Sequence, residues 1–189
     1  FSQQFAKGKR KTEIYESVLT IVRGLTKKIV LAGTLSNFSD YGFSHTSNPL
    51  VILIGVYAFS LQIYFDFSGY TDIARGSAGL FGISIPQNFA MPYFSQSIKE
   101  FWRRWHISLS SWFRDYLYVP LGGSKGGMWM KIRNTFLIFL VSGFWHGANW
   151  TFLIWGLLNA IYILPLIVFN RNRTNLDIVT HAKYFPTLK

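Results

Sequence analysis

Apolar residues recur along this chain at intervals that favour helices. In residues 13–34 they fall on one helical face, with Arg23 and Lys27 on the other. The residues on the apolar face are Ile14, Val18, Ile21, Val22, Leu25 and Ile29. This pattern predicts an amphipathic helix. Such a helix fits a position along a membrane surface and, equally well, an ordinary position against a protein core.

Residues 37–48 are rich in Asn, Ser, Asp and Gly, and this composition predicts a loop. Pro49 then suits the first position of a helix. The interval between Asp40 and Asp66 contains no Asp, Glu, Lys or Arg. We therefore expect residues 50–65 to form a helix that crosses a bilayer about once.

A short helix with small side chains is predicted after Asp72, around Ala74 and Ala78. Small residues at this spacing let helix backbones approach one another closely. Asp66, Asp72 and Arg75 are expected to pair inside the protein, since Asp72 and Arg75 have helical i,i+3 spacing. The uncharged residues 82–97 are interrupted by Gly and Pro. Such a segment is tolerated at membrane depth only where protein or a cavity covers it.

Residues 98–117 predict a second amphipathic helix, in which eight apolar residues fill one arc. His106 is the only polar residue within that arc, near its edge. The opposite side carries Lys99, Glu100, Arg103, Arg104, Ser108, Ser111, Arg114 and Asp115. A histidine in such a place is, taken alone, more often a satisfied core or interface residue than a catalyst.

A glycine-rich turn at residues 119–127 precedes a stretch from Asn134 to Asn170 that has no Asp, Glu, Lys or Arg. Glycines and Asn149 predict a break at residues 146–149. Residues 134–145 would span about 18 Å and residues 150–169 about 30 Å, so only the second is long enough to cross. His146 therefore lies either at depth or, in a hairpin with equal arms, nearer the far surface.

Composition places these helices in a membrane. Of 189 residues, 50% are apolar, 19% aromatic and only 14% charged, whereas soluble domains have about 25% charged residues. The net charge of +11 comes from residues that flank apolar segments, as in membrane anchoring, and no nucleic-acid motif is present. These flanking residues are Lys7, Lys9, Arg10, Lys11, Lys125, Lys131, Arg133, Arg171 and Arg173. The absence of cysteine excludes disulfides, thiolate metal sites and a cysteine nucleophile.

His146 is the candidate catalytic group, because an ionisable side chain surrounded by hydrocarbon is costly and is interpreted first as functional. Burial would keep its imidazole neutral and ready to accept a proton from a hydroxyl that attacks a thioester or ester carbonyl. Asn149 or a backbone N–H would stabilise the oxyanion. His106 and His146 are too few to hold a metal, and His45 lies in the predicted loop, so we expect no metal site.

Four blocks of this sequence together resemble the membrane-bound O-acyltransferase (MBOAT) family, in its bacterial polysaccharide branch and closest to the alginate-type acetyltransferases. The blocks are LQIYFDFSGYTD at 61–72, FWRRWHISLS at 101–110, FRDYLYVPLGG at 113–123 and GFWHGANW at 143–150. The resemblance implies an all-α, multi-pass helical membrane protein with amphipathic in-plane helices and a central pore. Residues 1–189 would be the central fragment of one MBOAT domain, with no separate soluble domain, and inactive alone.

The resemblance also implies site residues and partners. His146 falls on the invariant histidine of the family, and His106 on its second polar position, so both are expected to be catalytic. Substrate contacts are expected from Asn149, Trp145, Arg103 and Arg104. Arg103, Arg104 and Lys125 would contact the phosphates of the donor, although interfacial charge explains them more simply.

The reaction implied is transfer of an acetyl or similar acyl group, with acetyl-CoA or another thioester as donor and no bound cofactor. The acceptor would be an exported polysaccharide or a periplasmic acetyltransferase partner, and the protein would lie in the cytoplasmic (inner) membrane. Two alternatives remain open. One is a transporter or channel segment in which His146 and His106 relay protons. The other is a purely structural subunit.

Overall fold

A computed structural model describes residues 10–44 and 48–169, and the described residues form helices without any strand. The predicted all-α class is therefore confirmed. The chain divides into two compact units between Asn88 and Phe89. His45 and the basic residues Lys7, Lys9, Arg171 and Arg173 lie outside the described residues.

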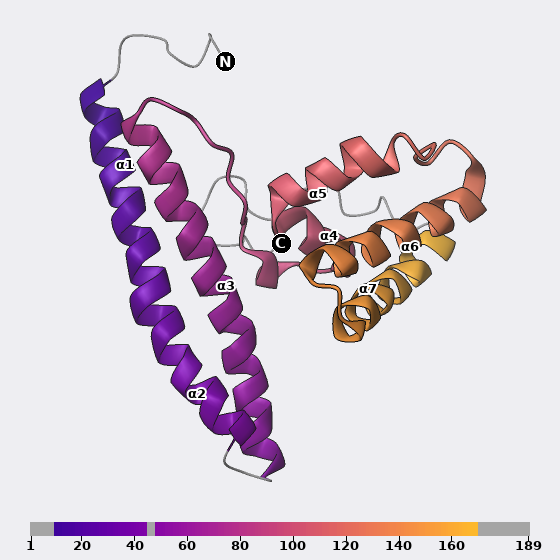
Figure 1. Ribbon diagram of the computed structural model, residues 1–189, viewed down its shortest axis with the longest axis horizontal. Coiled ribbons are helices and arrows are strands. Elements are labelled where there is room, and N and C mark those ends of the chain that lie inside the picture. The colour runs from indigo at the N-terminus through magenta and orange to yellow at the C-terminus, as the bar shows by residue number, and fades with distance from the viewer. Residues whose placement is uncertain (1–9, 45–47, 170–189) are drawn as a thin grey trace. The chain divides into compact units, whose positions relative to one another are not determined.

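The first unit is a long antiparallel pair (Figure 1). Helix α1 (Arg10–Leu25) continues through a π-helical segment (Thr26–Ala32) into α2 (Gly33–Ser44), and all three lie along α3 (Pro49–Leu80). Asn48 begins α3 as its N-cap, because its side chain accepts a hydrogen bond from Leu50 N. The helix predicted at 13–34 is confirmed and is part of this pair.

Small residues let the two arms approach closely, as the sequence predicted for the region around Ala74 and Ala78. A Cβ atom added to Gly24 would lie 2.7 Å from Gly69 O, and one added to Gly76 would lie 2.5 Å from Ser17 O. Because both distances are too short for any real side chain, larger residues at either glycine would push the helices apart.

Residues 49–80 form one helix, so the prediction of a separate short helix after Asp72 is wrong. Ion pairs explain how a single helix carries these charges: Lys28 Nζ lies 2.5 Å from Asp66 Oδ1, and Lys27 Nζ lies 2.6 Å from Asp72 Oδ2. Arg75 reaches the same carboxylate at 3.5 Å, which confirms the predicted pairing of Asp72 with Arg75.

The loop predicted at residues 37–48 is also wrong, since α2 continues to Ser44. Packing outweighs the loop-like composition here. Ser39 is buried and donates a hydrogen bond to Gln62 Oε1 of α3 at 2.8 Å, and a Cβ atom on Gly42 would lie 2.7 Å from the Cα atom of Gly55. Residues that favour turns in isolation are thus held in a helix by the neighbouring one.

In the second unit, residues 98–117 are not the single helix that their periodicity predicted. Helix α4 (Ile98–Arg104) ends at Trp105, α5 (Ile107–Phe113) starts after His106, and a π-helical segment (Arg114–Tyr118) follows. Residues 83–97, in the segment that Gly and Pro interrupt, are irregular apart from a 3₁₀ turn at Pro92–Phe94. Turns also occupy residues 119–126, as predicted.

Helices α6 (Gly127–His146) and α7 (Trp150–Val168) form a tight hairpin in which they lie side by side (Figure 1). The predicted break at 146–149 is confirmed. The first arm starts earlier than expected, so the arms have 20 and 19 residues and match the equal-armed hairpin. Gly143 and Gly156 meet at the crossing, where an added Cβ atom would strike Phe152 O or Phe139 O.

Two of the described helices, α3 and α7, are long and apolar enough to cross a membrane. The apolar windows of these helices are only 11% and 17% buried inside the protein. Helix α3 has 32 residues and is about 48 Å long, which exceeds the roughly 30 Å of a hydrocarbon core. Its charged half from Asp66 onward can therefore extend beyond the hydrocarbon.

Candidate active site

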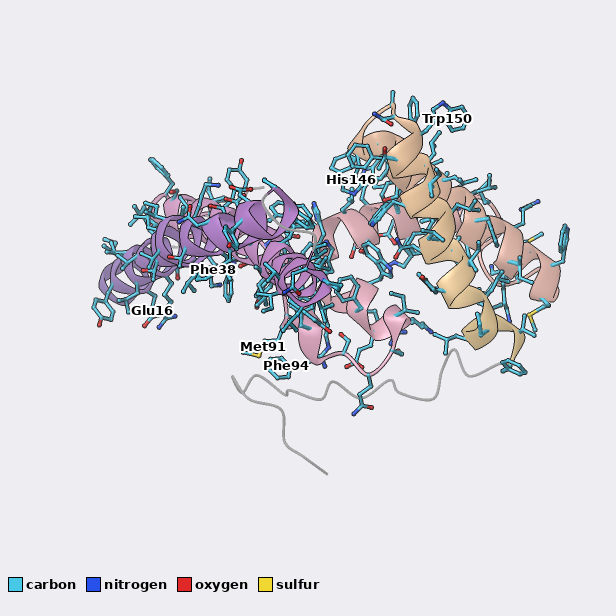
Figure 2. All side chains as sticks on the ribbon, turned by 90° about the horizontal axis from the view of Figure 1, so that it is seen from below. Glu16, Phe38, Met91, Phe94, His146 and Trp150 are labelled. Carbon is cyan, nitrogen blue, oxygen red and sulfur yellow. The ribbon has the colours of Figure 1, made fainter. Side chains whose placement is uncertain are left out.

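His146 is the last residue of α6, at the turn that starts α7. Gly147 N bonds to Phe144 O, and Asn149 N bonds to Gly147 O at 2.8 Å, which closes the turn. Asn149 is the N-cap of α7, with Oδ1 accepting hydrogen bonds from the backbone N and the hydroxyl of Thr151 at 3.1 Å each. Figure 2 shows His146 and Trp150 together at this end of the hairpin.

Aromatic rings surround the imidazole of His146. Its centroid lies 5.1 Å from that of Trp155, edge to face, and 6.2 Å from that of Phe152, nearly parallel. The centroid of Trp145 also lies 5.1 Å from that of His146. His146 is nevertheless an exposed residue, so these rings shield its imidazole from water only in part.

His106 occupies the corner between α4 and α5. Its backbone is in the left-handed region, with φ 45° and ψ 58°, a conformation that is uncommon outside glycine. The imidazole is half-buried, and its centroid lies 6.4 Å from that of the Phe89 ring and 6.5 Å from that of the Trp145 ring. The break in the helix therefore directs this histidine to the same tryptophan that contacts His146.

The structure thus brings the rings of both predicted catalytic histidines next to the ring of Trp145. Burial lowers the pKa of His106 below its usual value, a hydrogen bond with its own backbone acts in the opposite direction, and nearby His146 lowers the pKa further. Burial also lowers the pKa of His146. Both shifts favour the neutral imidazole, which is the form that can accept a proton.

The residues predicted to contact substrate are not all gathered here. Trp145 is 58% exposed and lies near both histidines, and Asn149 is exposed in the turn. Arg103 and Lys125 are exposed, whereas Arg104 is only 4% exposed and is bonded to Glu100 and to Ala90 O. This geometry does not support a contact between Arg104 and the donor phosphates.

Sequence reasoning missed the second layer of rings behind the histidines. The ring centroid of Trp155 lies 5.7 Å from that of Trp102, and the centroid of Trp102 lies 5.5 Å from that of Phe139. Phe152 and Trp155 have i,i+3 spacing at the start of α7, and a hairpin at 146–149 places that face beside the end of α6. This i,i+3 spacing was the sequence signal that could have identified these rings.

Within residues 10–44 and 48–169, no three His, Asp or Glu residues form a potential metal site.

The sequence profile of the membrane-bound O-acyltransferase (MBOAT) family matches residues 3–184. The chain belongs to this family. It is similar to the probable alginate O-acetylase AlgI of Pseudomonas aeruginosa, with 46% identity over 150 residues that cover 78% of this chain and 29% of that protein.

Two other MBOAT relatives have different named acceptors. The peptidoglycan O-acetyltransferase of Helicobacter pylori is 48% identical over 140 residues, which cover 73% of this chain and 27% of that protein. The teichoic acid D-alanyltransferase of Bacillus subtilis is 32% identical over 157 residues, which cover 78% and 40%. The chain thus spans less than half the length of each of these relatives.

Proposed function

We propose that the protein containing this chain is a membrane-embedded O-acyltransferase. It moves an acetyl or similar acyl group from a cytoplasmic thioester, such as acetyl-CoA, to a hydroxyl on the other side of the cytoplasmic (inner) membrane. The acceptor is an exported polysaccharide or a periplasmic acetyltransferase partner. The observation that carries this proposal is the pair of imidazoles next to Trp145, each with a pKa that burial lowers, in a chain whose relatives are named for acyl transfer to glycans.

His146 is assigned the general base. As the acceptor oxygen attacks the thioester carbonyl, the O–H proton passes to the neutral imidazole and the carbonyl electrons move to oxygen. The tetrahedral intermediate then collapses with cleavage of the C–S bond. The leaving thiolate takes the proton back from the imidazolium, so the products are an ester and a free thiol.

The neighbouring groups are assigned supporting roles. His106 reaches the same tryptophan and orients the acceptor hydroxyl or the carbonyl. The Nδ2 amide of Asn149 donates to the oxyanion while its Oδ1 caps α7. The aromatic rings limit water around the acyl group, which favours transfer over hydrolysis.

The test uses the full-length gene in its native host. His146→Ala should abolish ester-linked acetyl on the surface polysaccharides, measured as acetate released by alkali, at a normal level of membrane protein. Acetylation equal to the wild type would remove the enzyme assignment. It would favour the proton-relay alternative if proton flux through the membrane changed, and a structural subunit if it did not.

A further inference from the structure

Helix α4 contains a buried ion pair that the reaction proposed for the two histidines does not use. Glu100 and Arg104 are 7% and 4% exposed, and Arg104 Nη2 lies 2.7 Å from Glu100 Oε1. Glutamate and arginine are almost never fully buried unless they are paired. Because the desolvation of two charges offsets most of their attraction, a pair of this kind contributes little net stability.

The pair fastens the irregular segment before α4 to that helix. Arg104 Nη1 donates to Ala90 O at 3.1 Å, and Ala90 N donates to the backbone oxygen of Arg104 at 3.0 Å. The other oxygen of Glu100 accepts from Gln96 N at 2.9 Å. The two side chains thus hold both ends of residues 90–96 through backbone atoms, and these bonds define the register of the segment.

This attachment ends next to the strained corner at His106. A left-handed backbone at a residue other than glycine costs about 1–2 kcal/mol and persists only where the surroundings impose it. Phe89 is adjacent to Ala90, and its ring centroid lies 5.0 Å from that of Trp105 and 6.4 Å from that of His106. Ser110 Oγ closes the corner from the other side, 3.1 Å from Trp102 O and 3.3 Å from Trp105 O.

We propose that Glu100 and Arg104 are positioning residues, which impose the left-handed turn that directs His106 toward Trp145. The planar guanidinium is suited to this task because it binds a carboxylate and a carbonyl at once in fixed directions. This inference rests on the proposed function, since it assigns the pair a role in the same acyl transfer.

The first test measures acetyl transfer from acetyl-CoA in membrane vesicles that carry the full-length protein. Glu100→Gln should lower kcat by about ten- to a hundred-fold, as expected when a catalytic group is slightly misplaced. KM for acetyl-CoA should stay within about twofold of the wild type, because both side chains are buried and bonded within the protein. Glu16→Gln is the matched control, since Glu16 is exposed on α1, and it should leave both constants unchanged.

A second variant separates positioning from folding. Breaking the pair leaves Arg104 buried without its carboxylate, which can prevent folding, whereas replacing both partners with apolar residues is usually tolerated. The Glu100→Leu/Arg104→Met double variant should accumulate in the membrane at the wild-type level and still show the loss of kcat. A folded double variant with wild-type kcat would overturn the proposal. So would failure of both variants to accumulate, because the pair would then be structural.

His146→Ala in the same vesicles distinguishes this inference from the proposed function. If His146→Ala is inactive and Glu100→Gln has wild-type kcat, only the positioning role is lost. If His146→Ala transfers acetyl at the wild-type rate, the proposed function fails first, and the positioning role fails with it.

Discussion

At the scale of single residues, the chemistry depends on two imidazoles that aromatic rings partly remove from water. Trp145, Phe152 and Trp155 provide no hydrogen-bond acceptor that would favour a charged ring, and they contribute the burial that lowers the pKa of His146. His106 reaches the same tryptophan from a different helix corner. The neutral form of both imidazole rings is therefore favoured.

The pH dependence of acyl transfer follows from these shifts. A general base works only when neutral, so the rate falls as the pH drops through its pKa. Because burial lowers the pKa of both histidines from the ordinary value of about 6.5, the midpoint of the acid limb should lie below that value. Initial rates of the full-length protein in buffers of decreasing pH measure it, and a midpoint above neutrality would contradict the assignment.

Much of the site was accessible from the sequence, but its supporting groups were not. His146 was identifiable because it is the only titratable group near neutral pH in a long uncharged stretch. The burial of Glu100 and Arg104 was not, because a continuous helix places both on the polar side. The break at His106 turns that side toward residues 90–96, and a left-handed backbone at a histidine has no clear sequence signal.

At the scale of elements, the α6–α7 hairpin positions the candidate base. Its crossing depends on Gly143 and Gly156, and its turn depends on the cap formed by Asn149. The sequence predicted the break because glycines and Asn149 cluster there. It could not predict that α2 continues through residues 37–44, since the contacts of Ser39 and Gly42 with α3 outweigh local propensity.

Gly156→Ala should loosen the hairpin. The new Cβ atom would meet Phe139 O, which is backbone and cannot swing away, and overpacking of this kind costs about 1–3 kcal/mol. The thermal unfolding midpoint of the full-length protein in detergent should fall. Gly33→Ala is the control, because nothing lies within 4 Å of its Cβ position and alanine favours the helix. Equal midpoints for both variants would contradict the close crossing.

Asn149 should separate stability from chemistry. Asn149→Ala removes the cap of α7 and should cost about 1 kcal/mol, whereas Asn149→Asp keeps an acceptor for Thr151 N and should unfold like the wild type. Aspartate lacks the N–H donors, so its acetyl transfer should fall by about 10²–10³ if the amide stabilises the oxyanion. Wild-type transfer by Asn149→Asp would leave Asn149 with the capping role alone.

At the scale of the whole molecule, α3 and α7 carry apolar surface that stays largely exposed among the described residues. Their apolar windows are 11% and 17% buried, and large exposed apolar faces require lipid or further protein. The chain covers 29% of the probable alginate O-acetylase of Pseudomonas aeruginosa. The family to which both proteins belong consists of membrane proteins. The helical membrane class was predictable from composition, whereas the pairing of α1 and α2 with α3 was not.

Membrane integration is therefore expected of the full-length protein. Lysine–aspartate pairs can be disrupted by alkali, but the apolar faces of α3 and α7 should keep the protein in the bilayer. After alkaline carbonate washing, it should remain in the membrane pellet. Release into the supernatant would show that these helices are covered by protein instead of lipid.

The central claim, that His146 is the base of an acyl transfer, is tested most directly by one rate comparison. Vesicles with full-length wild-type protein or His146→Gln receive radiolabelled acetyl-CoA, and label in alkali-labile esters of the surface glycan is followed over time. Glutamine retains hydrogen-bonding capacity but cannot take up the proton, so the rate should fall by about 10²–10⁴. Transfer at the wild-type rate with equal amounts of protein would contradict the account.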